Sequence, residues 1–148
     1  MANSIIINEN DFLKARKKIK ENSGKKIIFS SNDDELNRKI LEKEKIDVLL
    51  LNLKGKKDRQ KQRESGFDHV MAKIAKKNNV SIGINLDEII ESKGKAKAKI
   101  LARIQQNIKL CNKNKINTEF IYGENRDFYD LKSLGLVLGM PTWMVKGL

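Results

Sequence analysis

Gly66-Phe-Asp-His-Val-Met-Ala-Lys-Ile-Ala-Lys-Lys-Asn-Asn-Val-Ser-Ile-Gly-Ile-Asn-Leu86 is the stretch that reveals the repeating unit of this chain. Residues 66–78 carry apolar side chains at helical spacing, and residues 80–86 form a short apolar run typical of a buried strand. The same alternation continues on both sides. Strands are predicted at residues 4–7, 26–30, 47–53, 80–86 and 117–122, and helices at residues 10–22, 33–45, 66–78, 95–114 and 126–138.

This alternation predicts an α/β fold, because repeated strand–helix units place parallel strands in one sheet with helices outside it. The arrangement is either an open layered sheet or a (β/α) barrel. Five units, with residues 142–145 as a candidate sixth strand, are fewer than the roughly eight of a closed TIM barrel. An incomplete barrel exposes edge strands that normally need a cover, so we expect the protein to work within an assembly.

Length and charge narrow the classes of function. At 148 residues the chain is expected to form a single domain, residues 1–148, with a substantial core. It contains 31 Lys and Arg residues against 19 Asp and Glu residues, which gives a net charge of +12. Such an excess favours a polyanionic partner, because each phosphate that is neutralised releases counterions. A lysine-rich proteome from an AT-rich genome would give a similar composition, so charge alone leaves both explanations open.

The sequence has no feature typical of a membrane or secreted protein. Its longest apolar run, Val48-Leu49-Leu50-Leu51, is far shorter than the roughly 20 residues of a membrane span. Residues 5–7 are too short an apolar patch for a signal peptide. The single cysteine, Cys111, cannot form an internal disulfide and fits a reducing compartment. We therefore expect a cytoplasmic protein without a membrane partner.

The residue types that catalysis needs are scarce. One histidine and one cysteine cannot furnish a zinc site. The chain lacks the nucleophile elbow GxSxG and the phosphate-binding patterns GxxxxGK[ST] and GxGxxG. Paired carboxylates are not predicted at matched carboxyl ends of strands, where barrel enzymes hold their catalytic groups. The sequence therefore predicts no catalytic residue, no metal ligand and no cofactor bound by the protein itself.

A strongly basic run precedes the helix predicted at 66–78. It reads Lys54-Gly-Lys-Lys-Asp-Arg-Gln-Lys-Gln-Arg63, with six basic residues and one acidic residue; we call it the basic segment. The only histidine, His69, falls with Lys73 on the polar face of the helix that follows. Ser65 and Asp68 match a capping box, so Ser65 is the predicted N-cap. The run and the histidine together predict a docking surface rather than an active site.

The helix predicted at 95–114 is amphipathic. At about 100° per residue, one arc of this helix is apolar and contains Ile100, Leu101, Ile104, Ile108 and Cys111. The opposite arc contains Lys95, Lys99, Arg103, Gln106, Lys109 and Lys113. The cysteine is therefore predicted to lie in the core. The basic stripe is long enough to follow several phosphates, although a solvated lysine face is an equally good explanation.

Three segments read as family motifs, in this order: the stretch Gly66 to Leu86, the helical segment Ala102-Arg103 through Leu110, and Asp130-Leu-Lys-Ser-Leu-Gly-Leu-Val-Leu-Gly-Met140. Together they resemble the family of protein component 3 of archaeal ribonuclease P, the counterpart of the eukaryotic thirty-kilodalton subunit. The resemblance implies a TIM-barrel-like fold. It also implies that the family's first strand–helix units are missing here, so that the barrel is N-terminally shortened or incomplete.

The resemblance further implies a non-catalytic subunit of ribonuclease P. Such a subunit binds the ribonuclease P RNA with protein component 2 and other holoenzyme proteins, and promotes removal of the 5′ leader from precursor tRNA, which it meets only indirectly. The RNA carries the chemistry and is expected to need Mg²⁺. The residues expected to bind RNA or a protein partner are Lys54, Lys56, Lys57, Arg59, Lys61, Arg63, His69, Lys73, Lys99 and Arg103.

Two other classes of function compete with this one. A generic basic RNA-binding protein explains the charge but not three ordered motifs. A metal-dependent phosphoesterase of a related barrel fold explains the strand–helix rhythm, but a single histidine argues against it.

Overall fold

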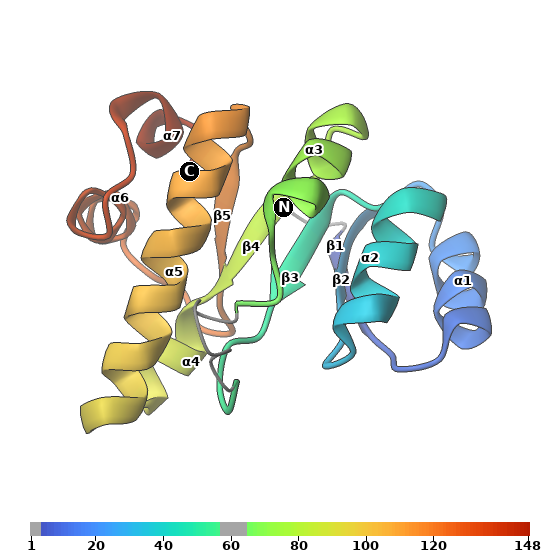
Figure 1. Cartoon of the computed structure of the whole chain (residues 1–148), viewed down its shortest axis with the longest axis horizontal. Coiled ribbons are helices and arrows are strands. Elements are labelled where there is room, and N and C mark those ends of the chain that lie inside the picture. Colours follow the sequence, from blue (N-terminus) through green and yellow to red (C-terminus); the bar gives the residue numbers. More distant parts are fainter. Residues whose placement is uncertain (1–3, 57–64) are drawn as a thin grey trace.

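The protein is built around a five-stranded parallel sheet, in a computed structural model that describes residues 4–56 and 65–148. The strands are β1 (Ser4–Asn8), β2 (Lys26–Ser30), β3 (Val48–Leu51), β4 (Ser81–Asn85) and β5 (Thr118–Ile121). They lie side by side in their order along the chain (Figure 1). The α/β prediction is confirmed, and each strand forms within two residues of its expected bounds. Sequential parallel order is also the order of strands in a TIM barrel.

The helices are α1 (Phe12–Glu21), α2 (Asp34–Lys43), α3 (His69–Lys77), α4 (Leu86–Glu91), α5 (Gly94–Asn114), α6 (Phe128–Val137) and α7 (Thr142–Lys146). Sequence patterns predict five of them and miss α4 and α7. The prediction of a sixth strand at 142–145 is wrong, because these residues form α7. Gly139 has a φ of +100° and ends α6, and the carbonyl of Pro141 then accepts the N–H groups of Met144 and Val145. The turn therefore continues into a helix.

The two faces of the sheet differ in their cover. Successive residues of a strand point to opposite faces. One set, which includes Phe29, Leu49 and Ile82, packs against helices in the main core. In Figure 1, α2, α3 and α5 lie on this face of the sheet. The opposite, inner face carries a small cluster of strand residues alone, in which Ile28, Val48 and Leu50 are buried and Ile121 packs against them.

The inner face is strongly curved. Lys26 on β2 forms an ion pair with Glu119 on β5, although β3 and β4 lie between these strands. The curvature is that of a barrel wall, but in the described residues β1 pairs only with β2 and β5 only with β4. Both edges of the sheet therefore have unpaired backbone groups within residues 4–56 and 65–148.

Gly83 permits this curvature, because a Cβ atom there would lie 3.0 Å from Val48 Cγ1, 3.2 Å from Ile121 Cγ1 and 3.3 Å from the Leu50 Cα. We expect Gly83→Ala to lower the free energy of unfolding by about 1–3 kcal/mol, the usual effect of overpacking a core. Urea denaturation measures it. Gly123→Ala is the control, since its Cβ would meet nothing closer than Asp87 Oδ2 at 3.6 Å. Equal stabilities of the two variants would contradict the prediction.

Among the residues described, no helix joins the length and the apolar character that crossing a membrane requires.

Candidate nucleic-acid interface

The basic segment leaves the sheet at the carboxyl end of β3. Lys54 is exposed there, and Lys56 is half-buried. The other four predicted contacts of the segment, Lys57, Arg59, Lys61 and Arg63, lie outside the described residues. In a parallel α/β fold the carboxyl ends of the strands form the edge at which ligands bind. The basic segment therefore begins at the edge of the sheet where a binding surface is expected.

Helix α4 holds the start of the basic segment. Asn85 caps α4 by accepting the N–H of Glu88 at 3.1 Å, and its amide donates to Asn52 Oδ1 at 3.0 Å. The Glu88 carboxylate then accepts the N–H of Leu53 at 2.8 Å and the N–H of Lys54 at 3.2 Å. Two backbone donors on one carboxylate fix the direction in which the chain leaves β3. The neighbouring Asp87 accepts the N–H of Gly123 at 3.1 Å and holds the connection after β5 in the same way.

Arg103 anchors the same segment from α5. Its side chain is only 2% exposed, and Nη2 donates to the Lys56 carbonyl at 2.7 Å. The prediction that Arg103 lies on the exposed stripe is therefore wrong. At about 100° per residue it stands only about 60° from Ile100 and so lies at the edge of the buried arc. Lys95, Lys99, Lys109 and Lys113 are exposed as predicted.

Asp34 ties the beginning of the basic segment to the stretch that follows it. Asp34 Oδ1, at the first residue of α2, accepts Lys56 Nζ at 2.6 Å. Gly66 has a φ of +73°, and a Cβ there would lie 2.9 Å from Asp34 Oδ1 and 3.0 Å from Lys56 Nζ. The chain therefore passes close to this ion pair before α3 begins, and a glycine is required for the approach.

His69 is the first residue of α3 and is exposed, as is Lys73 one turn later. Their shared polar face is therefore confirmed. Asp68, not Ser65, caps the helix: its carboxylate accepts the N–H of Met71 at 2.9 Å. Ser65 is buried instead, and its hydroxyl donates to the Phe67 carbonyl at 3.1 Å. The correction leaves His69 facing solvent at the positive end of a helix.

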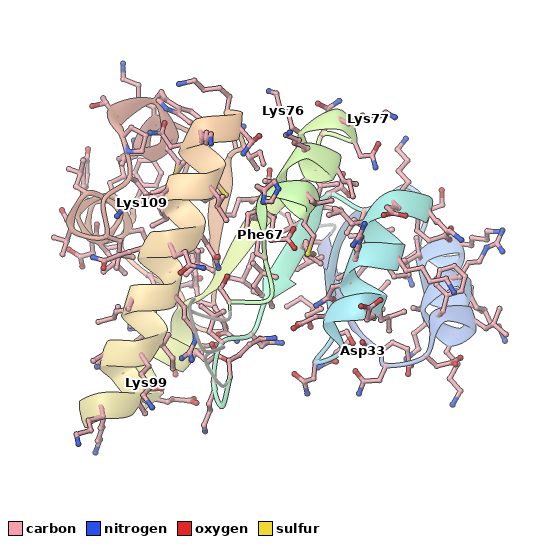
Figure 2. The ribbon with its side chains drawn as sticks, in the orientation of Figure 1. Asp33, Phe67, Lys76, Lys77, Lys99 and Lys109 are labelled. Atoms are coloured by element: carbon pink, nitrogen blue, oxygen red, sulfur yellow. The ribbon has the colours of Figure 1, made fainter. Side chains whose placement is uncertain are left out.

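The exposed lysines are spread along the molecule. Figure 2 shows Lys99 at the end where the strands finish, together with Asp33, and Lys76 and Lys77 at the opposite end. Lys99 therefore shares an end of the molecule with Lys54 and Lys56.

The groups at this edge are suited to hydrogen bonding and charge neutralisation. β1, β2 and β4 end in the uncharged polar residues Asn8, Ser30 and Asn85, and Asn52 directly follows β3. In the part of the chain that the structure describes, no three His, Cys, Asp or Glu residues gather closely enough to hold a metal ion. Cys111 is in the core, as predicted, and burial raises the pKa of its thiol to about 12. Lysine ammonium groups and backbone amides are the usual partners of phosphate.

Sequence reasoning missed the anchors Asp34, Glu88 and, in this role, Arg103. Asp34 and Glu88 each follow a predicted strand within a few residues. The carboxyl ends of parallel strands share one edge of a sheet, so acidic residues that follow one strand lie near a basic run that follows another. This pattern could have identified Asp34 and Glu88.

Glu88→Gln is expected to lower the free energy of unfolding by about 1–2 kcal/mol, because an amide retains one acceptor oxygen where the carboxylate bonds two backbone N–H groups. Hydrogen exchange of the Leu53 and Lys54 amides should accelerate. Glu91→Gln, on the exposed side of the same helix, is the matched control. Unchanged exchange in Glu88→Gln would show that the carboxylate does not hold the segment.

Known proteins of similar sequence and structure point to one family. The family model of RNase P subunit p30 matches residues 4–146. The chain is similar to ribonuclease P protein component 3 of Methanococcus vannielii, with 32% identity over 138 residues, 93% of this chain and 56% of that protein. It is also similar to the protein of this name from Methanocaldococcus jannaschii, with 30% identity over 87 residues, 59% of this chain and 35% of that protein.

A solved structure has the same fold. It is a chain in the cryo-EM structure of archaeal ribonuclease P with mature tRNA, with a TM-score of 0.77 and 23% identity, over 95% of this chain and 62% of that chain. The present chain spans about half the length of the curated relatives it matches.

Proposed function

Because the chain belongs to the family of RNase P subunit p30, we propose that it is a non-catalytic protein subunit of an archaeal ribonuclease P. In this proposal it binds the ribonuclease P RNA in the cytoplasm, together with protein component 2 and other holoenzyme proteins. It promotes removal of the 5′ leader from precursor tRNA, which it meets indirectly. The RNA performs the cleavage with Mg²⁺, and the protein supplies a positively charged surface that favours the folded RNA.

The observation that carries this proposal is the anchored start of the basic segment at the carboxyl edge of the sheet. Two carboxylates and one guanidinium hold the backbone and the Lys56 side chain there. Residues that are already held in place lose less conformational freedom on binding than free ones do, so more of the charge interaction of Lys54 and Lys56 appears as affinity. The proposed contacts are Lys54, Lys56, Lys57, Arg59, Lys61, Arg63, His69, Lys73 and Lys99. Arg103 enters the proposal as the residue that holds Lys56, since its guanidinium is buried.

Reconstitution tests the proposed function. The chain and protein component 2 are added to the cognate RNA at low Mg²⁺, and cleavage of precursor tRNA is followed. We expect cleavage to become faster than with RNA alone, because bound cationic protein lowers the Mg²⁺ needed to offset phosphate repulsion. An unrelated structured RNA of the same length serves as competitor and should compete weakly. No stimulation, or nuclease activity of the protein without RNA, would contradict the proposal.

A further inference from the structure

The strands and the helices that follow them form a row that begins with β1 and α1 and ends with β5 and α6. Exposed large apolar side chains gather at the two ends of this row. Among the described residues, four of them lie on α6 and two on the first unit, β1 and α1. Figure 1 shows α1 and α6 at opposite ends of the molecule. Scattered apolar residues are ordinary on a protein surface, but a contiguous set marks an interface.

The outward face of α6 is apolar where a surface helix normally carries charge. Tyr129, Leu136 and Val137 share one arc with Ser133, and the exposed fractions of Tyr129 and Val137 are 77% and 78%. The inward arc is apolar as well, since Leu134 packs against the main core. A helix that is apolar on both sides is normally buried on both sides. α6 therefore lacks a cover on its outer side within the described structure.

The opposite end of the row also lacks a cover. Ile5 and Ile7 of β1 pack toward the helices, so Ile6 points to the inner face, where it is 54% exposed. β1 contains no charged residue and pairs only with β2 in the described structure. Natural edge strands are usually charged, short or covered, because their free backbone groups recruit another strand. The edge of β1 therefore has the properties of a strand that pairs further.

The two ends carry opposite charge. The first unit, residues 4–22, contains five basic residues, Lys14, Arg16, Lys17, Lys18 and Lys20, against three acidic residues, Glu9, Asp11 and Glu21. The connection into α6 and its first turn carry three acidic residues, Glu124, Asp127 and Asp130, against one basic residue, Arg126. Residues 118–148 contain four acidic and three basic residues, in a chain whose net charge is +12. Contact between the α1 end and the α6 end joins unlike charges, whereas contact between two α6 ends joins like charges.

We propose that a second copy of this chain docks head to tail, so that β5 and α6 of one copy meet β1 and α1 of the other. A twofold axis parallel to the strands then generates the same contact a second time. The two curved five-stranded sheets close into one barrel, because a head-to-tail contact forms a ring when the rotation that relates the copies returns to the first copy. Both open edges are then paired and both apolar ends are covered. All strands keep one direction, so Lys54 and Lys56, which follow β3 in each copy, lie at the same end of the barrel. This inference goes beyond the proposed function, which does not need self-association.

The mass of the chain in solution tests the proposal. Sedimentation equilibrium at micromolar concentration should give twice the 17.0 kDa of one chain. A species of 17.0 kDa would overturn the proposal, because another protein or further chain would then have to cover the ends. A mass that keeps growing with concentration would also overturn it, because the row would then extend without closing.

Two variants block opposite ends of the row. Val137→Lys on α6 and Ile6→Lys on β1 should each sediment as a monomer, with the circular dichroism of the unmodified protein. Val70→Lys on α3, an exposed valine on a helix that contacts α2 and α5 in the middle of the molecule, is the control and should remain a dimer. A dimeric Ile6→Lys variant would overturn the proposal, because α6 would then pair with itself. If Ile6→Lys does not fold, Leu13→Lys on α1 blocks the same end.

Mixing the two monomeric variants distinguishes head-to-tail docking from docking between two like ends. Each variant keeps one intact end, and the two intact ends complement each other. We expect an equimolar mixture to form a heterodimer through one interface, weaker than the dimer of the unmodified chain, which has two. Failure of the mixture to associate would overturn the proposal.

Discussion

Neutralising four positions of the basic segment is expected to weaken binding of ribonuclease P RNA on the order of a hundredfold at physiological salt, since each lost phosphate contact removes a counterion-release term. The variant replaces Lys57, Arg59, Lys61 and Arg63 by glutamine. The slope of log K against log salt should become shallower by about 0.7–0.9 per contact. Filter binding or fluorescence anisotropy across a salt series measures both quantities.

The control for this variant removes the same charge elsewhere. It replaces four lysines remote from the basic segment, namely Lys43, Lys45, Lys77 and Lys146, by glutamine. General attraction between a cationic protein and RNA falls equally in the two variants. Loss of direct phosphate contacts lowers affinity further only in the variant of the basic segment. Equal losses of affinity in the two variants would therefore show that the basic segment does not touch the RNA.

The strands were predictable because their apolar runs are short, buried and bounded by polar residues. β2 forms over the predicted residues, and β4 differs by one residue at each end. α4 was missed because Leu86 continues the apolar run of β4 in sequence, while the Asn85 side chain that begins the helix is visible only once its bond to the N–H of Glu88 is known. α7 was missed because five residues that include Trp143 and Val145 have the composition of a strand.

The anchors of the basic segment could not be predicted in the same way. The bond from Leu53 to Glu88 spans 35 residues of sequence, and the bond from Arg103 to Lys56 spans 47. Such pairs depend on how the units pack, not on local periodicity. Arg103 adds a second difficulty, because a residue at the edge of a helical arc can turn its long side chain either to solvent or inward. The Arg103 side chain turns inward because the Lys56 carbonyl in the neighbouring loop accepts its hydrogen bond.

Arg103→Met is expected to weaken RNA binding without removing a phosphate contact. Methionine fills similar space but leaves the Lys56 carbonyl without the bond from Nη2. Loss of a buried hydrogen bond from a charged donor lowers the free energy of unfolding by about 1.5–3 kcal/mol. Amide exchange in residues 53–56 should accelerate, and Arg103→Lys should recover part of the loss, since an ammonium group can donate to the same carbonyl.

Lys99→Met separates this positioning role from direct contact. Lys99 lies one turn earlier on α5, is exposed, and loses the same charge when replaced. As a proposed phosphate contact it should make the salt slope shallower by about 0.7–0.9 with unchanged stability. Arg103→Met should instead lower both stability and affinity while the slope changes little, because the basic side chains remain but the segment that carries them is no longer held. If Arg103→Met changed the slope as Lys99→Met does and left stability unaltered, Arg103 would be a direct contact and its guanidinium would have to leave its buried site in the complex.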